Sequence, residues 1–233
     1  MKVVEIFGSI DGEGLRTGEL ATFIRLAGCN LRCSYCDTCY ALKNSDGIEM
    51  TIDEILEKVK NIGYKNVTLT GGEPLIHKDI DELIKALLEN NYMINIETNG
   101  SIDISNLDKR ILITMDYKTP ASNEENKMNL ANFNYLKEND VLKFVCNRND
   151  LPKVKEIIKN NNIKSYIYLS PIFNEIDPVE LVDFLKELHK ENIDTKKIRV
   201  QIQLHKIIWS PDERSVWWRN LMKKNVKKQS NHY

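Results

Sequence analysis

The chain has 233 residues, of which 42% are apolar, and this suffices for one large domain with a sizeable core. Lysine and arginine total 33 against 34 aspartates and glutamates, so no basic excess points to nucleic acid. No apolar run reaches the roughly 18 residues of a membrane span. The N-terminus lacks the long apolar region of a signal peptide, so we expect a cytoplasmic protein without a membrane partner.

Short apolar segments rich in β-branched residues alternate with amphipathic segments along the chain. The strands expected from this enrichment cover residues 3–7, 21–27, 66–70, 93–97, 111–116, 141–146, 165–169 and 198–204. Apolar residues at helical spacing predict helices over residues 51–62, 79–90, 151–159 and 178–190, and a less regular one over 129–137. Thr51 and Glu54 form a capping box before the first of these helices.

A strand–helix repeat of this kind implies parallel strands joined by helical crossovers. We therefore expect an α/β fold, a partial or modified (β/α) barrel of about six parallel strands, with a doubly wound sheet as the alternative. In both folds, functional residues gather at the C-terminal ends of the strands. We expect a single domain over residues 1–222, followed by a basic, disordered tail over residues 223–233.

Four of the five cysteines fall within eleven residues, directly after the strand expected at 21–27. Such spacing cannot staple a domain of this length, and metal binding or redox chemistry is the better interpretation. Cys29, Cys33 and Cys36 stand at the spacing CxxxCxxC, which favours an iron–sulfur cluster with one iron left open. The alternative is a structural zinc site with Cys39 as the fourth ligand, although no second Cys or His pair is present. Cys146 ends an apolar strand and is expected to be a buried hydrophobe.

The cysteine motif, with Tyr35 before its last cysteine, resembles the cluster motif of the radical S-adenosylmethionine (SAM) superfamily. A second segment agrees, because Thr70-Gly71-Gly72-Glu73-Pro74 ends the next strand and resembles the superfamily's GGE segment. In that superfamily the backbone of this segment meets the amino group of SAM. The resemblance implies a [4Fe–4S] cluster on the three cysteines, SAM as a cofactor and the superfamily's modified barrel.

Flanking segments narrow the resemblance to the 7-carboxy-7-deazaguanine synthase family. They are FGSIDGEG at 7–14, CDT at 36–38, IETNG at 96–100, DYKTP at 116–120, LSP at 169–171 and QIQLHK at 201–206. The family's reaction converts 6-carboxy-5,6,7,8-tetrahydropterin into 7-carboxy-7-deazaguanine with loss of ammonia, in queuosine-precursor biosynthesis. The alternative function is a glycyl-radical-enzyme or ribonucleotide reductase activase, but those carry a proline where Glu13 stands here.

The resemblance also implies a set of site residues, position by position. SAM is expected near Tyr35, Asp37, Gly72, Thr114, Asp116 and Lys118, and Mg²⁺ at Thr38. The pterin substrate is expected at Ile10, Asp11, Gly12, Glu13, Arg25, Thr70 and His205. Asp11 departs from the many relatives that have glutamine there. A homodimer and an electron donor of the flavodoxin or ferredoxin type are expected as well.

Three of these residues have plainer interpretations. Arg25 alternates with apolar residues in its strand, so it either faces the barrel and grips the substrate carboxylate or is simply ion-paired. His205 follows the strand expected at 198–204 and is either a rim residue of the site or an ordinary capped histidine. Thr38 either binds Mg²⁺ or caps a turn through a backbone hydrogen bond.

Overall fold

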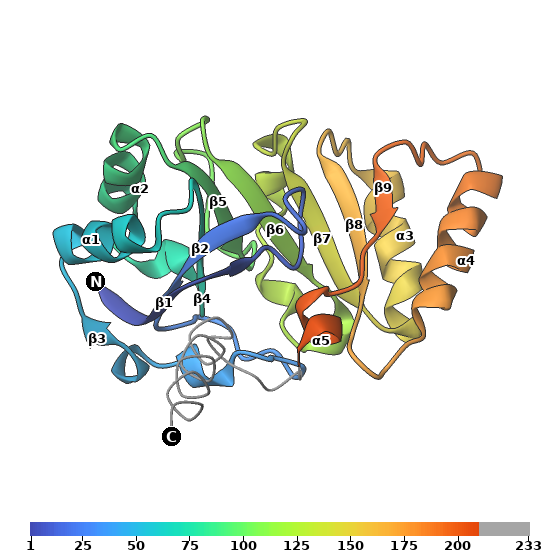
Figure 1. The fold of residues 1–233 in the computed structure, drawn as a ribbon. Coiled ribbons are helices and arrows are strands. Elements are labelled where there is room, and N and C mark those ends of the chain that lie inside the picture. Colours follow the sequence, from blue (N-terminus) through green and yellow to red (C-terminus); the bar gives the residue numbers. More distant parts are fainter. Residues whose placement is uncertain (210–233) are drawn as a thin grey trace, which may run out of the picture.

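The structure, a computed structural model, describes residues 1–209. The tail expected at 223–233, and the end of the domain expected at 222, lie outside the described residues. A single sheet of nine strands runs through the described part of the chain in the order β3-β1-β2-β4-β5-β6-β7-β8-β9 (Figure 1). The strands are β1 Lys2–Ile10, β2 Leu20–Leu26, β3 Ile48–Glu49, β4 Asn66–Gly71, β5 Met93–Thr98, β6 Leu112–Lys118, β7 Val141–Cys146, β8 Tyr166–Pro171 and β9 Ile198–Val200.

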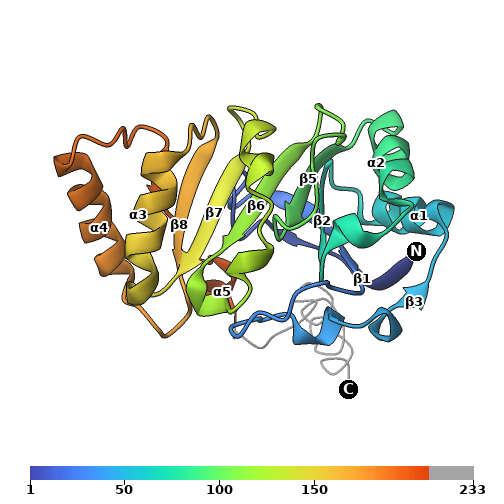
Figure 2. The ribbon, with the colours of Figure 1, turned by 180° about the vertical axis from the view of Figure 1, so that it is seen from behind.

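Seven of these strands, β2 and β4 to β9, are parallel, while β1 pairs antiparallel with both β2 and β3. The order of the parallel strands in the sheet is the same as their order in the sequence, so each new strand is added on the same side of the previous one. Because strand–helix–strand connections are right-handed, crossovers that all advance the same way place their helices on one face. The two opposite views show this arrangement (Figures 1 and 2). The expected partial barrel is therefore confirmed, and the doubly wound sheet is excluded.

The outer face carries the helices α1 Ile52–Ile62, α2 Ile80–Glu89, α3 Leu151–Asn160 and α4 Pro178–Lys190. The predicted capping box starts α1, with Glu54 N–H donating to Thr51 Oγ1 at 3.2 Å and Thr51 N–H donating to Glu54 Oε2 at 2.7 Å. The same helix ends at Gly63, whose φ of 86° suits glycine. One continuous core lies between these helices and the apolar face of the sheet.

Two predicted elements differ in the structure. The helix expected over residues 129–137 is a 3₁₀ turn, Leu130–Asn134. Asparagine side chains account for this, because Asn129 Oδ1 accepts from the Ala131 N–H and buried Asn132 donates to the backbone oxygens of Gly100 and Ile102. The strand expected over 198–204 ends at Val200.

Within residues 1–209, the remaining short elements are α5, His205–Ile208, and six further 3₁₀ turns. These turns are Cys39–Ala41, Asn44–Asp46, Pro74–Ile76, Pro120–Ser122, Glu125–Lys127 and Arg148–Asp150. None of the described helices combines the length and apolarity needed to cross a membrane.

The two sides of the open barrel are joined by Gln201, the residue that directly follows β9. Gln201 accepts from the Gly14 N–H at 2.8 Å and donates to the Gly14 carbonyl at 3.1 Å and to Thr17 Oγ1 at 2.7 Å. The Leu204 N–H adds a bond to the Gly12 carbonyl at 3.1 Å. The loop between β1 and β2, residues 11–19, is thereby held against the chain that follows β9.

Candidate active site

Polar side chains line the inner face of the sheet toward the C-terminal ends of the parallel strands. Arg25 of β2 lies beside Thr70 of β4, and Asp116 of β6 lies beside Lys143 of β7. The residues that alternate with them in β2 and β4 are apolar and fully buried in the core. Because successive side chains of a strand point to opposite faces, the apolar residues pack against the helices and the polar ones face the interior.

These polar side chains surround a cavity of about 740 Å³. Sixteen of the seventeen site residues predicted from the sequence line it: Ile10, Gly12, Glu13, Arg25, Cys29, Cys33, Tyr35, Cys36, Asp37, Thr38, Thr70, Gly72, Thr114, Asp116, Lys118 and His205. Only Asp11 does not. The full lining of the cavity comes from six strands, β1, β2 and β4 to β7, and from the loops around them, as the C-terminal rim of a parallel barrel allows.

The three motif cysteines lie in the loop after β2, residues 27–47, which we call the cluster loop. Cys29, Cys33 and Cys36 are half-buried, carry free thiols and line the cavity together. Burial raises the pKa of the Cys36 thiol to about 11 and also raises that of Cys33. Both thiols therefore keep their protons at neutral pH until a metal displaces them.

The other two cysteines are placed differently. Cys39 is exposed, does not line the cavity, and donates through Sγ to the Cys36 carbonyl at 3.0 Å. Cys146 is fully buried in the core, as expected for a small hydrophobe. The described residues therefore bring three thiols to the cavity, without a fourth.

The paired glycines at the end of β4 allow the strand to reach the cluster loop. A Cβ on Gly72 would lie 2.1 Å from the Gly28 carbonyl oxygen, and one on Gly71 would lie 2.1 Å from the Leu26 carbonyl oxygen. The Glu73 N–H donates to that same Gly28 oxygen at 2.8 Å. Here the glycines are required for backbone-to-backbone packing, and this brings the main chain of Gly72 to the cavity wall.

Arg25 is held in the cavity wall by an acid and an aromatic ring. Its Nε donates to Glu5 Oε1 at 2.8 Å, and its guanidinium lies 5.7 Å from the ring centroid of Tyr40. The Tyr40 hydroxyl donates to the same Glu5 oxygen at 3.1 Å. Both interpretations of Arg25 are thus met in part, because the residue is ion-paired through Nε and lines the cavity as well.

Lys143 lies between the carboxylates of Glu13, which is predicted to bind the pterin, and Asp116, which is predicted to bind SAM. Its Nζ is 2.7 Å from Glu13 Oε2 and 3.1 Å from Asp116 Oδ1, while Lys118 contacts the other Asp116 oxygen at 2.8 Å. Burial alone would lower the pKa of Lys143, but Asp116 and Glu13 outweigh it, so its pKa lies well above the ordinary value. The same two lysines outweigh burial at Asp116 and lower the pKa of that carboxyl. The two lysines and Asp116 are therefore ionised near neutral pH.

Sequence reasoning missed Lys143 and also Glu97, which accepts from Thr70 Oγ1 at 2.7 Å at the cavity wall. Burial raises the pKa of Glu97, and Lys143 only partly opposes this. The signal that could have found both residues is the one that identified Arg25. Each is a single charged residue within an otherwise largely apolar strand, and such a charge must be paired or functional when buried.

Asp11 is not part of the cavity lining and is only 2% exposed. Its Oδ1 accepts from Thr68 Oγ1 at 2.9 Å, while Oδ2 has no hydrogen-bond partner among the described residues. Burial, followed by the nearby charge of Glu97, raises the pKa of Asp11 to about 7. The neutral form of this carboxyl is therefore substantially populated at neutral pH.

The short helix α5 completes the cavity on the side of the β1–β2 loop. A Cβ on Gly12 would lie 2.4 Å from His205 Nδ1, so the imidazole rests directly on that glycine. Lys206 Nζ contacts Asp37 Oδ2 at 3.0 Å and lies 5.5 Å from the ring centroid of Phe173. The Asp37 side chain is half exposed, and the positive charge of Lys206 lowers the pKa of its carboxyl to about 2. The ion pair ties α5 to the cluster loop.

The donor set and the cavity fit the cofactors that the sequence implied. Three soft sulfur ligands on one loop suit an iron–sulfur cluster, and the absence of a fourth cysteine from the cavity leaves a coordination position for another ligand. The Gly72 main chain and the charged groups of β6 offer polar contacts to a zwitterion such as SAM. In addition, Glu13 Oε1 is buried at the cavity without a partner among the described residues, which indicates room for a hydrogen-bond donor.

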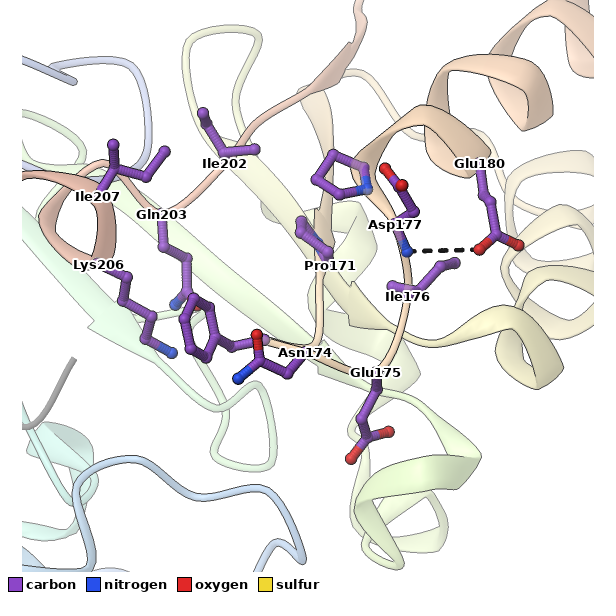
Figure 3. Close-up of a pocket in the computed structure, with 12 residues that line it drawn as sticks. Pro171, Asn174, Glu175, Ile176, Asp177, Glu180, Ile202, Gln203, Lys206 and Ile207 are labelled. Atoms are coloured by element: carbon purple, nitrogen blue, oxygen red, sulfur yellow. Dashed lines mark hydrogen bonds between the residues drawn. The ribbon is translucent and has the colours of Figure 1, made fainter.

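A second, smaller groove of about 520 Å³ lies between the segment that joins β8 to α4 and the residues in and just before α5 (Figure 3). It is lined by Pro171, Phe173, Asn174, Glu175, Ile176, Asp177, Pro178, Glu180, Ile202, Gln203, Lys206 and Ile207. Its carboxylates are largely engaged already, since Asp177 caps α4 and Glu180 accepts from Arg148 at 2.6 Å. The motif cysteines and most of the buried charged residues described above line the larger cavity, which is therefore the candidate active site.

Comparison with known proteins agrees with this site. A family model described as the radical SAM superfamily matches residues 23–185. The chain is 48% identical over 225 residues to a 7-carboxy-7-deazaguanine synthase of Clostridium acetobutylicum, a match that covers 92% of this chain and 99% of that protein. It is 38% identical over 213 residues to a 7-carboxy-7-deazaguanine synthase of Methanospirillum hungatei, covering 91% of this chain and 86% of that protein.

Among solved structures, QueE from Escherichia coli aligns with a TM-score of 0.68 at 23% identity, covering 88% of this chain and 94% of that chain. SuiB from Streptococcus suis bound to S-adenosylmethionine aligns with a TM-score of 0.53 at 18% identity, covering 75% and 47%. At such identities the likeness concerns the fold, and it agrees with the open barrel described above.

Proposed function

Because the chain belongs to the radical SAM superfamily and, within it, to the 7-carboxy-7-deazaguanine synthases, we propose that its central cavity converts 6-carboxy-5,6,7,8-tetrahydropterin into 7-carboxy-7-deazaguanine with loss of ammonia. The product is a 7-deazapurine on the route to queuosine. The observation that carries the proposal is one cavity lined by three cysteines together with Arg25 and Glu13. The activase alternative is not favoured, because the relatives that match nearly the whole chain are synthases.

The cofactors divide between the cluster loop and the strand ends. Cys29, Cys33 and Cys36 would hold the [4Fe–4S] cluster. SAM would lie against Tyr35, Asp37, Gly72, Thr114, Asp116 and Lys118. When bound, the cluster and SAM supply the radical that takes a hydrogen atom from the pterin. The chain's own residues bind and orient both molecules and shield them from water.

Arg25 and Glu13 are assigned to opposite functional groups of the pterin. With Nε committed to Glu5, the outer nitrogens of Arg25 can meet the substrate carboxylate as a fork. The buried Glu13 Oε1 can accept from the N–H groups of the pterin's guanidine-like edge. Lys143 engages the other carboxylate oxygen of Glu13, Oε2, at 2.7 Å. Ile10, Asp11, Gly12, Thr70 and His205 complete the assigned substrate pocket.

Thr38 is assigned to Mg²⁺. Its hydroxyl donates to Asp37 Oδ1 at 3.0 Å, and this leaves the lone pairs of the hydroxyl oxygen available at the cavity wall. Mg²⁺ takes oxygen ligands in octahedral geometry and usually retains several waters, so one protein oxygen together with the substrate carboxylate suffices.

The protein acts on a small molecule, and the remaining partners belong to the proposal. We assign it an electron donor of the flavodoxin or ferredoxin type, a homodimeric assembly and a cytoplasmic location. No nucleic-acid or membrane partner is assigned, in keeping with the balanced charge of the chain.

The reaction can be tested with protein reconstituted anaerobically with iron and sulfide. Incubation with SAM, Mg²⁺, a low-potential reductant and the carboxypterin should yield the deazapurine carboxylate and one ammonia per product. Cys29→Ala should lose both products, whereas Cys39→Ala should retain the cluster. Cleavage of SAM without deazapurine formation would refute the assigned substrate. Loss of iron on Cys39→Ala alone would refute the three-cysteine assignment.

A further inference from the structure

Asn99, directly after β5, lies against a motif cysteine. Its Nδ2 is 3.8 Å from Cys29 Sγ, within hydrogen-bonding reach of sulfur. The same sulfur receives the Leu31 N–H from within the cluster loop at 3.4 Å. Asn99 therefore brings a second donor to Cys29 from a different element of the fold.

The orientation of the Asn99 amide follows from its surroundings. The Ser101 backbone N–H lies 3.0 Å from the Asn99 side-chain atom assigned as Oδ1, and the Ser101 hydroxyl donates to the same atom at 2.6 Å. A backbone N–H can only donate, so the atom facing it must be the amide oxygen. The amide nitrogen must then face Cys29.

Asn99 also belongs to a closed ring of side chains. Its Nδ2 donates to Asn30 Oδ1 at 3.0 Å, and Asn30 Nδ2 donates to Ser101 Oγ at 2.8 Å. The Ser101 hydroxyl then closes the ring at Asn99 Oδ1. These three hydrogen bonds hold the amide in one place.

The backbone of Asn99 is fixed from below by Glu73, which is completely buried. Glu73 Oε2 accepts from the Asn99 N–H at 2.6 Å, and Oε1 accepts from Thr98 Oγ1 at 2.9 Å. Both carboxylate oxygens of Glu73 therefore already accept hydrogen bonds from the protein. Glu73 anchors the residue that reaches the cysteine.

We propose that Asn99 is a positioning residue that raises the reduction potential of the cluster through Cys29. The proposal rests on the three-cysteine assignment made above. A hydrogen bond to a ligand thiolate draws negative charge from the sulfur, and this favours the reduced cluster, which carries one more electron. Because the donor is already fixed, reduction requires no rearrangement of this contact.

The test is the midpoint potential of the reconstituted cluster, followed by the electron paramagnetic resonance signal of its reduced form without SAM or pterin. Asn99→Ala removes the donor and should shift the potential to a more negative value. Asn30→Ala is the matched control, because it breaks the ring but leaves the Asn99 amide pinned by Ser101. Its potential should remain that of the unmodified protein. Equal potentials in all three proteins would overturn the proposal, and so would equal shifts in both variants.

Asn99→Asp is the second variant and decides the matter if Asn99→Ala does not retain its cluster. The carboxylate keeps the acceptor for Ser101 and replaces the donor with a negatively charged oxygen. The midpoint potential should fall further than in Asn99→Ala. A potential equal to that of the unmodified protein would overturn the proposal. Since no pterin is present, the outcome is independent of the substrate assignment, which turnover tests separately.

Discussion

At the scale of the single residue, Arg25 has two functions. Its Nε makes a structural bond to Glu5, while its outer nitrogens remain for a ligand in the cavity. The guanidinium also lies over the ring of Tyr40. A lysine at this position could supply the charge without the planar fork. The geometry of the group, in addition to its charge, is therefore what the assigned substrate would use.

The first prediction tests that use. Arg25→Ala should raise the KM for the carboxypterin roughly 10- to 100-fold, because a charge-assisted pair contributes about 1.5–3 kcal/mol. The dissociation constant for SAM, measured by calorimetry, should change little. Arg25→Lys should recover only part of the loss. Equal weakening of pterin and SAM would instead identify Arg25 as a purely structural residue.

The second prediction concerns Asp11, whose pKa of about 7 lies above its ordinary value of 3.8. The folded protein holds this proton more tightly than the unfolded chain, so the stabilisation is complete at low pH and is lost as pH rises through 7. From pH 5 to 7 the unfolding free energy of the unmodified protein should fall by roughly 2 kcal/mol relative to Asp11→Asn. Chemical denaturation at several pH values measures the difference. A pH-independent difference would show that Asp11 is ionised throughout.

The third residue-scale prediction concerns Thr38. Mg²⁺ should raise turnover, and Thr38→Ala should abolish most of that dependence while the iron content stays unchanged. Thr38→Ser keeps the hydroxyl and serves as the control. A full response of Thr38→Ala to Mg²⁺ would move the metal elsewhere and leave the cluster assignment intact.

At the scale of elements, the contact between the end of β4 and the cluster loop leaves no room for a side chain. Gly72→Ala would place a Cβ 2.1 Å from the Gly28 oxygen, where backbone on both sides must shift. We expect a loss of roughly 2–3 kcal/mol of stability together with incomplete iron loading. Gly18→Ala is the control, because nothing lies within 4 Å of that position and its φ of +90° brings strain alone. It should cost about 1 kcal/mol and load iron normally. Full loading of Gly72→Ala would show that the loop adapts.

At the scale of the whole molecule, the hydrogen bonds of Gln201 to Gly14 and Thr17 join the two sides of the open barrel. We call this contact the clamp at Gln201. Gln201→Ala should speed amide hydrogen exchange in residues 11–18 while β4 to β7 keep their protection. Mass spectrometry of exchanged peptides provides the measurement. Uniformly faster exchange would mean that the variant has lost global stability instead.

Much of the architecture could be predicted from sequence because each strand is a short apolar run and each helix has a clear 3.6-residue period. The site followed from motif resemblance, and sixteen of its residues meet in one cavity. What escaped prediction depended on side chains acting across the fold. Lys143 is paired with Asp116 on the neighbouring strand and with Glu13, 130 positions away in the sequence. The asparagines near residue 130 favour a 3₁₀ turn through their side-chain bonds, and apolar spacing does not record such bonds.

The clamp at Gln201 also bears on the order in which the chain folds. Its bonds to Gly14 join residues 187 positions apart, whereas neighbouring parallel strands are joined by much shorter connections. Loop-closure entropy and the dependence of folding rate on contact distance both make such a long-range contact slow to form. During synthesis the cluster loop leaves the ribosome long before Gln201 does. The chain therefore passes through a stage in which the strands near the cysteines can pair while the far wall of the cavity is still missing, and iron can reach the cysteines before the barrel closes.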